Sequence, residues 1–404
     1  MNVTERLTRY AKVDTQSDEF STATPSTQKQ FVLAEMLKEE LTGLGLVNVE
    51  LTDSCIVYGT LEANAEGQPC IGFLAHMDTS PAASGENVKP RVIEKYDGGE
   101  IVLNEELGIV MTPEQFPQLL KDKGCDLLVT DGTTLLGGDD KAGITAIMGM
   151  LEYCQEHPEF KHGRIAVAFT PDEEVGRGVE NFSIERFGAD FAYTVDGFNA
   201  DELCYDCFFA NSAEVKVHGL SIHPGSAKGK MKNSLLIAME FQSLLPTFDN
   251  PMYTEDREGF NHLCDMQGDC EDTVMHYIIR NHDLAKLNKQ VGDFKAAAAF
   301  LNYKYGKDTI TLDIRETYRN MRERIEQCPE VLEKASAAIR SLGYEPVSYA
   351  VRGGTDGAGL TAMGLPTPNL GTGDRNCHGK FEYVNLNELE KVVEVLKEIV
   401  RVPE

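Results

Sequence analysis

The chain has 404 residues, of which 42% are hydrophobic and 25% charged, as in ordinary globular proteins. At about 150 residues per domain, this length predicts two or three domains. The formal charge of −27 argues against binding to nucleic acid or to an anionic membrane surface, because both are themselves negative.

The sequence contains no apolar run near the roughly 20 residues of a membrane helix. Its first residues, MNVTERLTRYAKVDTQSDE, lack the apolar centre of an export signal, so we expect a cytoplasmic protein. The ten cysteines are scattered and do not predict a disulfide scaffold. Cys204 and Cys207 lie in a strand-like segment rather than at a helix start, so we expect free thiols there instead of a redox or metal site.

The first half of the chain alternates apolar runs with helical patterns. The runs PCIGFLAHMD (69–78), GRIAVAFTPDE (163–173) and FAYTVDG (191–197) are typical of buried parallel strands. Residues 141–157 place apolar side chains on one face of a helix. This alternation predicts an α/β domain with a largely parallel sheet covered by helices on both faces. Helical patterns return later at 329–343 and 385–401.

Between about Phe208 and Met321 the pattern changes to alternating apolar and polar residues, as in half-buried antiparallel strands. Two long helical patterns are interleaved with these strands. We therefore predict an α+β domain over residues 208–321, inserted into a discontinuous α/β domain formed by residues 1–207 and 322–404. The strand-like segments are 213–219, 273–283 and 308–318, and the helical ones are 233–245 and 284–301.

Acidic and histidine residues gather where the predicted strands end or in loops. In open α/β sheets, loops at the carboxyl ends of strands form the binding crevice. Residues i and i+2 of an extended chain point the same way, so Asp78 could hold the His76 imidazole while the other ring nitrogen binds a metal ion. The alternative is an ordinary polar pair at a strand end. The segments are His76-Met77-Asp78, Asp139-Asp140, Glu173-Glu174, Asp196 and His378.

Two of these segments are pairs of adjacent acids. Asp139 and Asp140 open a predicted helix after two glycines, but one aspartate is enough to cap it, so one carboxylate is free for another role. Glu173 and Glu174 follow a buried strand, where their charges repel each other unless a cation is present. Because neighbouring side chains point apart, one of them can bind metal while the other acts as a general base.

Together these residues form a mixed set of nitrogen and oxygen donors, which suits Zn²⁺ or another borderline divalent ion. Five ligands can make two three-ligand sites only if one carboxylate is shared. Two metal ions about 3.5–4 Å apart that hold a water are typical of hydrolytic enzymes.

Eight segments over essentially the whole length resemble the M20 family of dinuclear zinc peptidases: GFLAHMDTSP, TLLGGDDKAG, TPDEEVGRG, YTVDG, HPGSAKG, MHYIIR, VRGGTDGAGL and NCHGKFEYV. The resemblance implies a zinc-peptidase catalytic domain, with a mostly parallel mixed sheet flanked by helices. It makes the insertion a lid and dimerisation domain, and hence implies a homodimer. The implied activity is that of a metallo-aminopeptidase which removes the N-terminal residue from tripeptides.

The resemblance also gives the acids and histidines their roles. It makes Glu173 the general base and Asp78 the partner of His76, and it implies a cis peptide after Asp139. Two zinc ions per subunit are implied. Their ligands would be His76 and Asp196 for one ion, Glu174 and His378 for the other, and Asp139 as the bridge.

In the implied lid, His223 matches a histidine that reaches the active site of the partner subunit and stabilises the oxyanion. Arg280 and Arg352 match residues that take the terminal carboxylate of the substrate, which a forked guanidinium can bind through two hydrogen bonds. On the residues alone, a loop histidine and surface ion pairs are the alternatives. Residues 373–381, around His378, depart from the family pattern and alter the rim of the pocket, which bears on substrate preference.

Two alternative functions stay open. One is a sister activity on the same site, namely a dipeptidase, a carboxypeptidase or an N-acyl-amino-acid deacylase. The other is a catalytically inactive binding homologue. That second alternative would lack a metal ligand or the base, and every one of these residues is present.

Overall fold

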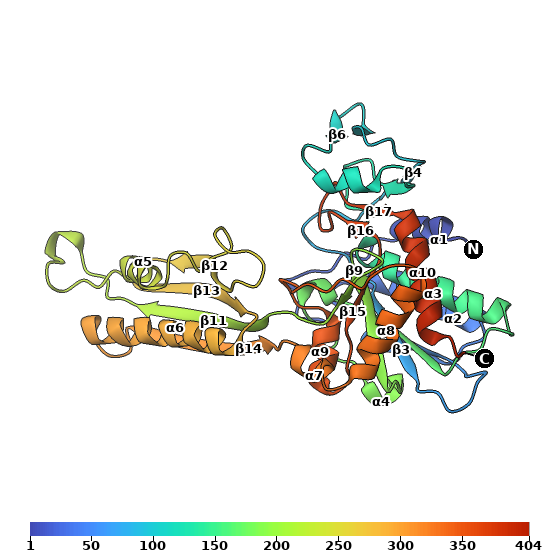
Figure 1. Ribbon diagram of the computed structural model, residues 1–404. Helices are drawn as coiled ribbons and strands as arrows, with labels where there is room; N and C mark the ends of the chain where they lie inside the picture. Colours follow the sequence, from blue (N-terminus) through green and yellow to red (C-terminus); the bar gives the residue numbers. More distant parts are fainter. Residues whose placement is uncertain (404) are drawn as a thin grey trace. The chain divides into compact units, whose positions relative to one another are not determined.

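The computed structural model describes residues 1–403, which form two compact units, each with its own hydrophobic core (Figure 1). Unit 1 contains residues 1–205, 323–349 and the chain from Thr355 onward. Unit 2 contains residues 206–322 and the short segment 350–354, which lies outside the insertion expected at 208–321. No helix in the described part of the chain is both long and apolar enough to cross a membrane.

A seven-stranded mixed sheet runs through unit 1 in the order β1-β2-β8-β3-β9-β15-β10. Its four central strands, β8, β3, β9 and β15, are parallel, and the outer pairings are antiparallel. The prediction of a mostly parallel sheet is confirmed at the apolar runs, since every residue of β3 and β8 is buried. The strands are β1 (Val47–Leu51), β2 (Val57–Leu61), β3 (Ile71–His76), β8 (Ile165–Thr170), β9 (Phe191–Gly197), β10 (Leu203–Cys204) and β15 (Asn369–Gly371).

Helices cover both faces of this sheet, as the alternating side chains of β3 show. Ile71 and Phe73 point into the larger core with α3 and α10, whereas Leu74 points into a smaller core with α4 and α9. Helix α3 packs on β3 and β9 through the apolar face predicted for residues 141–157. The helices are α1 (Val3–Ala11), α2 (Gln30–Gly43), α3 (Gly138–Glu156), α4 (Ile184–Phe187), α7 (Arg322–Ile325), α8 (Pro329–Ser341), α9 (Asp356–Met363) and α10 (Leu386–Val400), with 3-10 turns η1 (Pro117–Asp122) and η2 (Glu173–Val175).

Unit 1 also holds two small antiparallel sheets that the apolar patterns do not predict. One has the order β16-β17-β7-β4, and the other is the hairpin β5–β6. Leu127, Val129 and Tyr383 belong to the separate core beneath them. The loop between β16 and β17 carries His378. The strands are β4 (Arg91–Ile93), β5 (Ile101–Asn104), β6 (Ile109–Met111), β7 (Leu127–Val129), β16 (Asp374–Arg375) and β17 (Tyr383–Asn385).

Unit 2 is an antiparallel sheet of four strands in the order β12-β13-β11-β14, packed against two helices. The alternating segments and the two long helices predicted from the sequence are all present, so the predicted α+β fold is confirmed. Strand β12 is an additional element. The elements are β11 (Phe209–His218), η3 (Pro224–Ser226), α5 (Ser234–Leu244), β12 (Phe260–Gly268), β13 (Asp272–Asn281), α6 (Leu284–Tyr305) and β14 (Ile310–Tyr318).

Leucine truncation tests the packing of the larger core. Leu396 of α10 is fully buried, whereas Leu107, in the β5–β6 turn, is 63% exposed. Because Leu396→Ala leaves a cavity, we expect the free energy of unfolding to fall by about 2–5 kcal/mol. The matched control Leu107→Ala should change it by less than about 0.5 kcal/mol. Urea unfolding measures both, and equal effects would contradict the assigned packing.

Candidate metal centre

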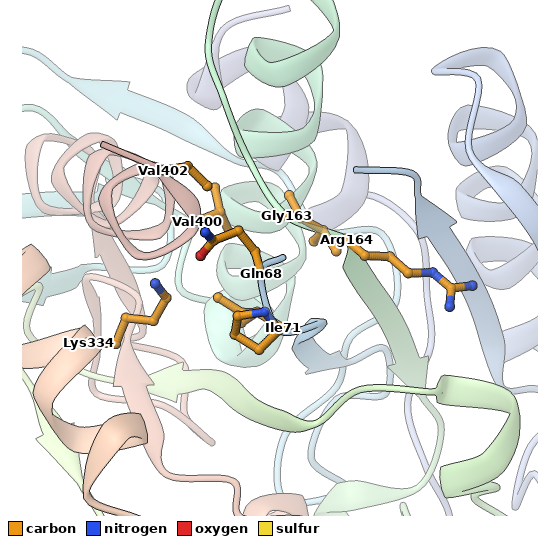
Figure 2. A pocket seen from close by; sticks show the side chains of 9 residues that line it. Gln68, Ile71, Gly163, Arg164, Lys334, Val400 and Val402 are labelled. Carbon is orange, nitrogen blue, oxygen red and sulfur yellow. The ribbon is translucent and has the colours of Figure 1, made fainter. Parts of the chain in front are cut away.

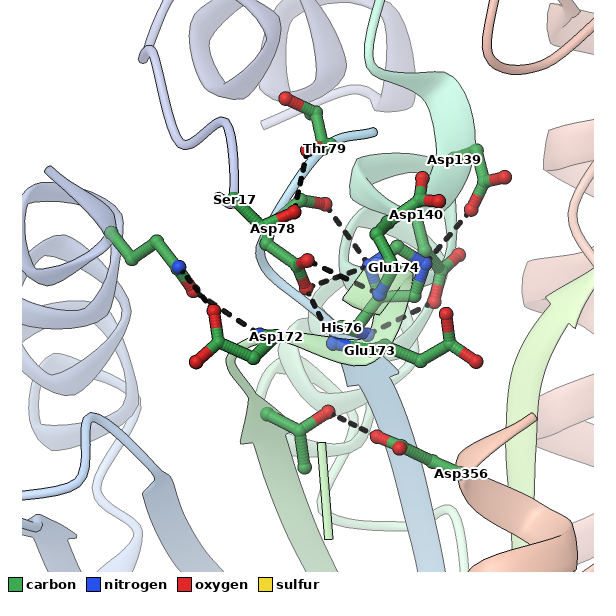
Figure 3. A network of polar contacts seen from close by, with 12 residues as sticks. Ser17, His76, Asp78, Thr79, Asp139, Asp140, Asp172, Glu173, Glu174 and Asp356 are labelled. Carbon is green, nitrogen blue, oxygen red and sulfur yellow. Dashed lines mark hydrogen bonds and ion pairs between the residues drawn. The ribbon is translucent and has the colours of Figure 1, made fainter. Parts of the chain in front are cut away.

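The five segments with acidic or histidine residues meet at one edge of the large sheet. Figure 3 shows three of them, with His76, Asp139 and Glu174 drawn close together. His76 ends β3, Glu173 and Glu174 follow β8, and Asp196 lies near the end of β9. Because these strands are parallel neighbours, their carboxyl ends lie side by side. The start of α3 supplies Asp139, and the loop after β16 supplies His378.

The Asp139 carboxylate lies between two imidazoles. Its Oδ1 is 2.8 Å from Nε2 of His76, and its Oδ2 is 3.1 Å from Nε2 of His378. Each imidazole faces a second acid, since Asp196 Oδ1 is 3.7 Å from the His76 nitrogen and Glu174 Oε2 is 2.9 Å from the His378 nitrogen. The result is two nitrogen and oxygen donor sets that share one carboxylate.

Asp78 fixes both the His76 ring and the turn after β8. Nδ1 of His76 donates to the Asp78 carbonyl oxygen at 3.0 Å and lies 3.3 Å from its Oδ1. Since a carbonyl only accepts, this ring nitrogen carries a proton, which fixes the ring so that Nε2 points at Asp139. The Asp78 carboxylate also accepts the N–H groups of Glu173 and Glu174, at 3.0 and 3.2 Å.

The turn before α3 is held by Glu382, a residue that the sequence reasoning missed. Its carboxylate accepts the N–H groups of Leu136, Gly137 and Asp139, at 2.6, 2.8 and 3.1 Å. The Asp139–Asp140 peptide is cis, as the resemblance implies. The one sequence signal for Glu382 is its position four residues after the candidate ligand His378.

Other buried acids support the site from behind. Asp140 accepts the N–H groups of His76 and Gly143. Because Asp140 caps the start of α3, the Asp139 carboxylate is available for another role. Asp172 accepts from the Ser26 N–H at 2.7 Å and from the Gln30 side chain at 2.7 Å, which ties the turn after β8 to the start of α2. These long-range partners left no pattern in the sequence.

The cluster concentrates negative charge in a buried place. Burial raises the pKa of Glu174 to about 7, that of Asp196 to about 6 and that of Glu173 well above its ordinary value. Hydrogen bonds to Asp139 and Glu174 raise the pKa of His378 to about 11. All these pKa shifts follow from an excess of buried acidic groups over cations. The acids ionise less readily, and His378 keeps its proton.

The donors fit divalent metal ions. Glu174 Oε1 is buried and has no hydrogen-bond partner among residues 1–403. A buried, unpaired carboxylate oxygen is costly unless a cation or donor meets it. Sets of ligand atoms within 4.8 Å of one another include His76, Asp139 and Glu174, and also His76, Asp140 and Asp196.

A small cavity lies at the other end of the same strands (Figure 2). It is lined by Ile71 and Ile165, the first residues of β3 and β8, and by Lys334 and Val400. Its volume of about 10 Å³ is too small for a peptide, so it does not compete with the metal centre as a substrate site.

The remaining predicted residues, His223, Arg280 and Arg352, belong to unit 2. His223 is exposed just before η3, and its Nδ1 accepts the Gly225 N–H. Arg280 lies over the Tyr318 ring and donates through Nη1 alone, to two backbone carbonyls. Its Nε and Nη2 have no hydrogen bond within the described chain.

Arg352 is engaged differently. Its guanidinium donates to the carbonyl oxygens of Asp256 and Glu258, at 3.0 and 2.8 Å, and to the Thr254 hydroxyl at 3.0 Å. It also lies over the rings of Phe208 and Phe260. These contacts hold the loop 254–258 in unit 2.

The chain is similar to known peptidases in sequence and fold. Residues 136–402 match Peptidase family M20/M25/M40. Peptidase T of Geobacillus kaustophilus is 51% identical over 398 residues, which cover 98% of this chain and 97% of that protein. A tripeptidase structure from Staphylococcus aureus aligns with a TM-score of 0.77 at 21% identity, covering 99% of this chain and 97% of the other. YXEP of Bacillus subtilis, a dinuclear metal binding peptidase from the M20 family, aligns with a TM-score of 0.63 at 13% identity, covering 98% and 96%.

A methyl group at Gly143 tests the close packing of α3 beside Asp196. An added Cβ would lie 1.9 Å from the Val195 carbonyl oxygen, so the helix or the strand must shift. We expect Gly143→Ala to lower the free energy of unfolding by about 1–3 kcal/mol. Gly43→Ala is the matched control, because nothing lies within 4 Å of its added Cβ. Urea unfolding that ranks the two equally would contradict this geometry.

Proposed function

The chain belongs to peptidase family M20/M25/M40, and from this premise we propose that it is an aminopeptidase which hydrolyses the N-terminal residue from tripeptides. The Asp139 carboxylate, between His76 and His378 at 2.8 and 3.1 Å, carries the proposal. A carboxylate shared in this way can bridge a pair of metal ions, as is typical of hydrolytic enzymes. The cysteines have free thiols, which suits a reducing compartment, so we place the protein in the cytoplasm.

We assign two zinc ions per subunit. Nitrogen and carboxylate donors without a full set of oxygens favour zinc over magnesium or calcium. When bound, the ions supply Lewis acidity, which makes a water more acidic and polarises the scissile carbonyl. The assigned ligands are His76 and Asp196 for one ion, Glu174 and His378 for the other, and Asp139 as the bridge.

Glu173 is the general base in this proposal. Asp78 holds its backbone N–H, so the side chain leaves the turn in a fixed direction next to the ligand Glu174. Glu173 takes a proton from the attacking water and passes it to the amine of the departing peptide. Asp78 acts on the same step indirectly, because it also orients His76.

A substrate panel tests the activity against its sister activities. A tripeptide, a dipeptide, a tripeptide with a blocked N-terminus and an acetylated amino acid are assayed side by side. The proposal expects release of the N-terminal residue from the free tripeptide with the highest kcat/KM. Preference for the dipeptide, for release of the C-terminal residue or for the acetylated amino acid would assign a dipeptidase, carboxypeptidase or deacylase instead.

Replacing the base should separate metal binding from turnover. Glu173→Gln preserves the shape but removes the proton acceptor, so kcat should fall by at least about 10²–10⁴-fold while zinc content stays unchanged. Asp139→Ala should instead lose at least one zinc ion, because two facing cations would lack a shared negative charge. Kinetics and elemental analysis measure both. Near-normal activity of Glu173→Gln with zinc bound would exclude Glu173 as the base.

Recognition of the substrate's C-terminal carboxylate is assigned to unit 2. Arg280 offers Nε and Nη2 side by side, the geometry that takes a carboxylate through two hydrogen bonds. Arg352, whose Nη1 and Nη2 donate to loop 254–258, is proposed to bind the same carboxylate. His223 is proposed to stabilise the oxyanion.

A lysine at position 280 should weaken this recognition. A hydrogen-bonded ion pair is worth about 1.5–3 kcal/mol, so Arg280→Lys should lower kcat/KM for a free tripeptide by about 10–100-fold. The loss should be much smaller for the tripeptide amide, which has no carboxylate. Arg315→Lys, at a 77% exposed side chain in a surface ion pair, is the control. Equal losses on both substrates would contradict carboxylate binding.

We further propose a homodimer through unit 2, with His223 acting in the partner's active site. Strand β12 is at the edge of its sheet, and α5 exposes Leu236 and Met239. Open sheet edges and exposed apolar residues are both features that proteins commonly cover. Sedimentation at varied protein concentration tests the dimer.

Subunit mixing tests the action of His223 across the dimer. His223→Ala should lower kcat by about 10²–10³-fold without loss of zinc, because it removes one oxyanion donor. Mixing it with Glu173→Gln under conditions that allow subunit exchange should restore part of the activity. Only a site that combines Glu173 of one chain with His223 of the other is then intact. Absence of hydrolysis after demonstrated exchange would contradict this arrangement.

A further inference from the structure

Cys377 stands directly before His378, in the loop between β16 and β17. Its sulfur, a ring nitrogen of His378 and a carboxylate oxygen of Asp139 all lie within 4.8 Å of one another. The thiol is half-buried and makes no hydrogen bond within residues 1–403. A soft donor without a partner therefore faces the same space as two of the proposed metal ligands.

Glu174 adds an independent observation at this end of the cluster. Its Oε2 is 2.9 Å from Nε2 of His378, while its Oε1 is buried and unpaired within the described chain. The Glu174 side chain is only 4% exposed, so water cannot reach this oxygen freely. Glu174 therefore contacts His378 through one oxygen and keeps a second, buried oxygen for which the described chain supplies no donor.

We propose that the Cys377 thiolate is a further ligand of the ion held by Asp139, Glu174 and His378. This inference rests on the metal pair of the proposed function and adds a sulfur donor to only one of its two positions. The thiol gives up its proton when it binds, as coordinating thiols do. The position at His76 and Asp196 keeps nitrogen and oxygen donors alone.

The two positions should therefore differ in metal preference. Thiolate ligands select soft and borderline ions such as Cd²⁺ and Zn²⁺, whereas carboxylates also accept Mg²⁺ and Mn²⁺. The ion beside Cys377 should be held more tightly and exchanged for Cd²⁺ more readily than its neighbour. Selectivity of this kind is a property of the chain's own donors and can be measured without substrate.

Cobalt substitution tests the sulfur ligand directly. The full chain loaded with two Co²⁺ ions should show the intense near-ultraviolet absorption of a thiolate bound to cobalt. Cys377→Ser should lose that absorption while still binding two ions, and Cys377→Ala should give the same loss. Cys264→Ser, at an exposed cysteine of unit 2, is the matched control and should keep it.

Competition between Cd²⁺ and Zn²⁺ gives a second measurement. The preference of one position for Cd²⁺ should fall by at least about tenfold in Cys377→Ser, the range typical for lost metal-site partners. Two bound cobalt ions without the absorption, or an absorption that persists in Cys377→Ser, would overturn the inference and leave the proposed function intact. Failure of the unaltered chain to bind two ions would overturn both.

Discussion

Repulsion among buried carboxylates at one edge of the parallel sheet is the constraint around which unit 1 is arranged. Such acids stay ionised only where donors or cations meet them. Backbone N–H groups provide much of that compensation. Those of Glu173 and Glu174 point at Asp78, and those of Leu136, Gly137 and Asp139, around the start of α3, point at Glu382. The turns that carry the candidate ligands therefore take their shapes from the charges that they surround.

Local patterns were sufficient wherever burial repeats along the chain. Continuous apolar runs located β3, β8 and β9, and the acids at their ends became neighbours because parallel strands bring their carboxyl ends together. The same argument could not find Glu382, because its partners lie more than 240 residues away in the chain. Strands β16 and β17 are too short for any periodicity, and β12 has mostly exposed residues.

Arginine chemistry shows a different limit of sequence reasoning. Arg280 and Arg352 look alike as forked cations that follow apolar segments. In the structure, Nε and Nη2 of Arg280 make no hydrogen bond within the described chain. Nη1 of Arg352 instead donates to two carbonyl oxygens more than 90 residues away. Which of the two has donors to spare depends on the loop 254–258, whose path no local pattern encodes.

Because backbone N–H groups neutralise Glu382, the turn around it restricts the backbone more than the side chains during evolution. A side-chain change at Leu136 leaves the main-chain N–H in place, so the Glu382 carboxylate beside it keeps that hydrogen bond. Proline is the exception, since it has no N–H to offer. Position 136 can therefore accept many side chains, whereas proline there would remove one of the three backbone N–H groups that meet the buried Glu382 carboxylate.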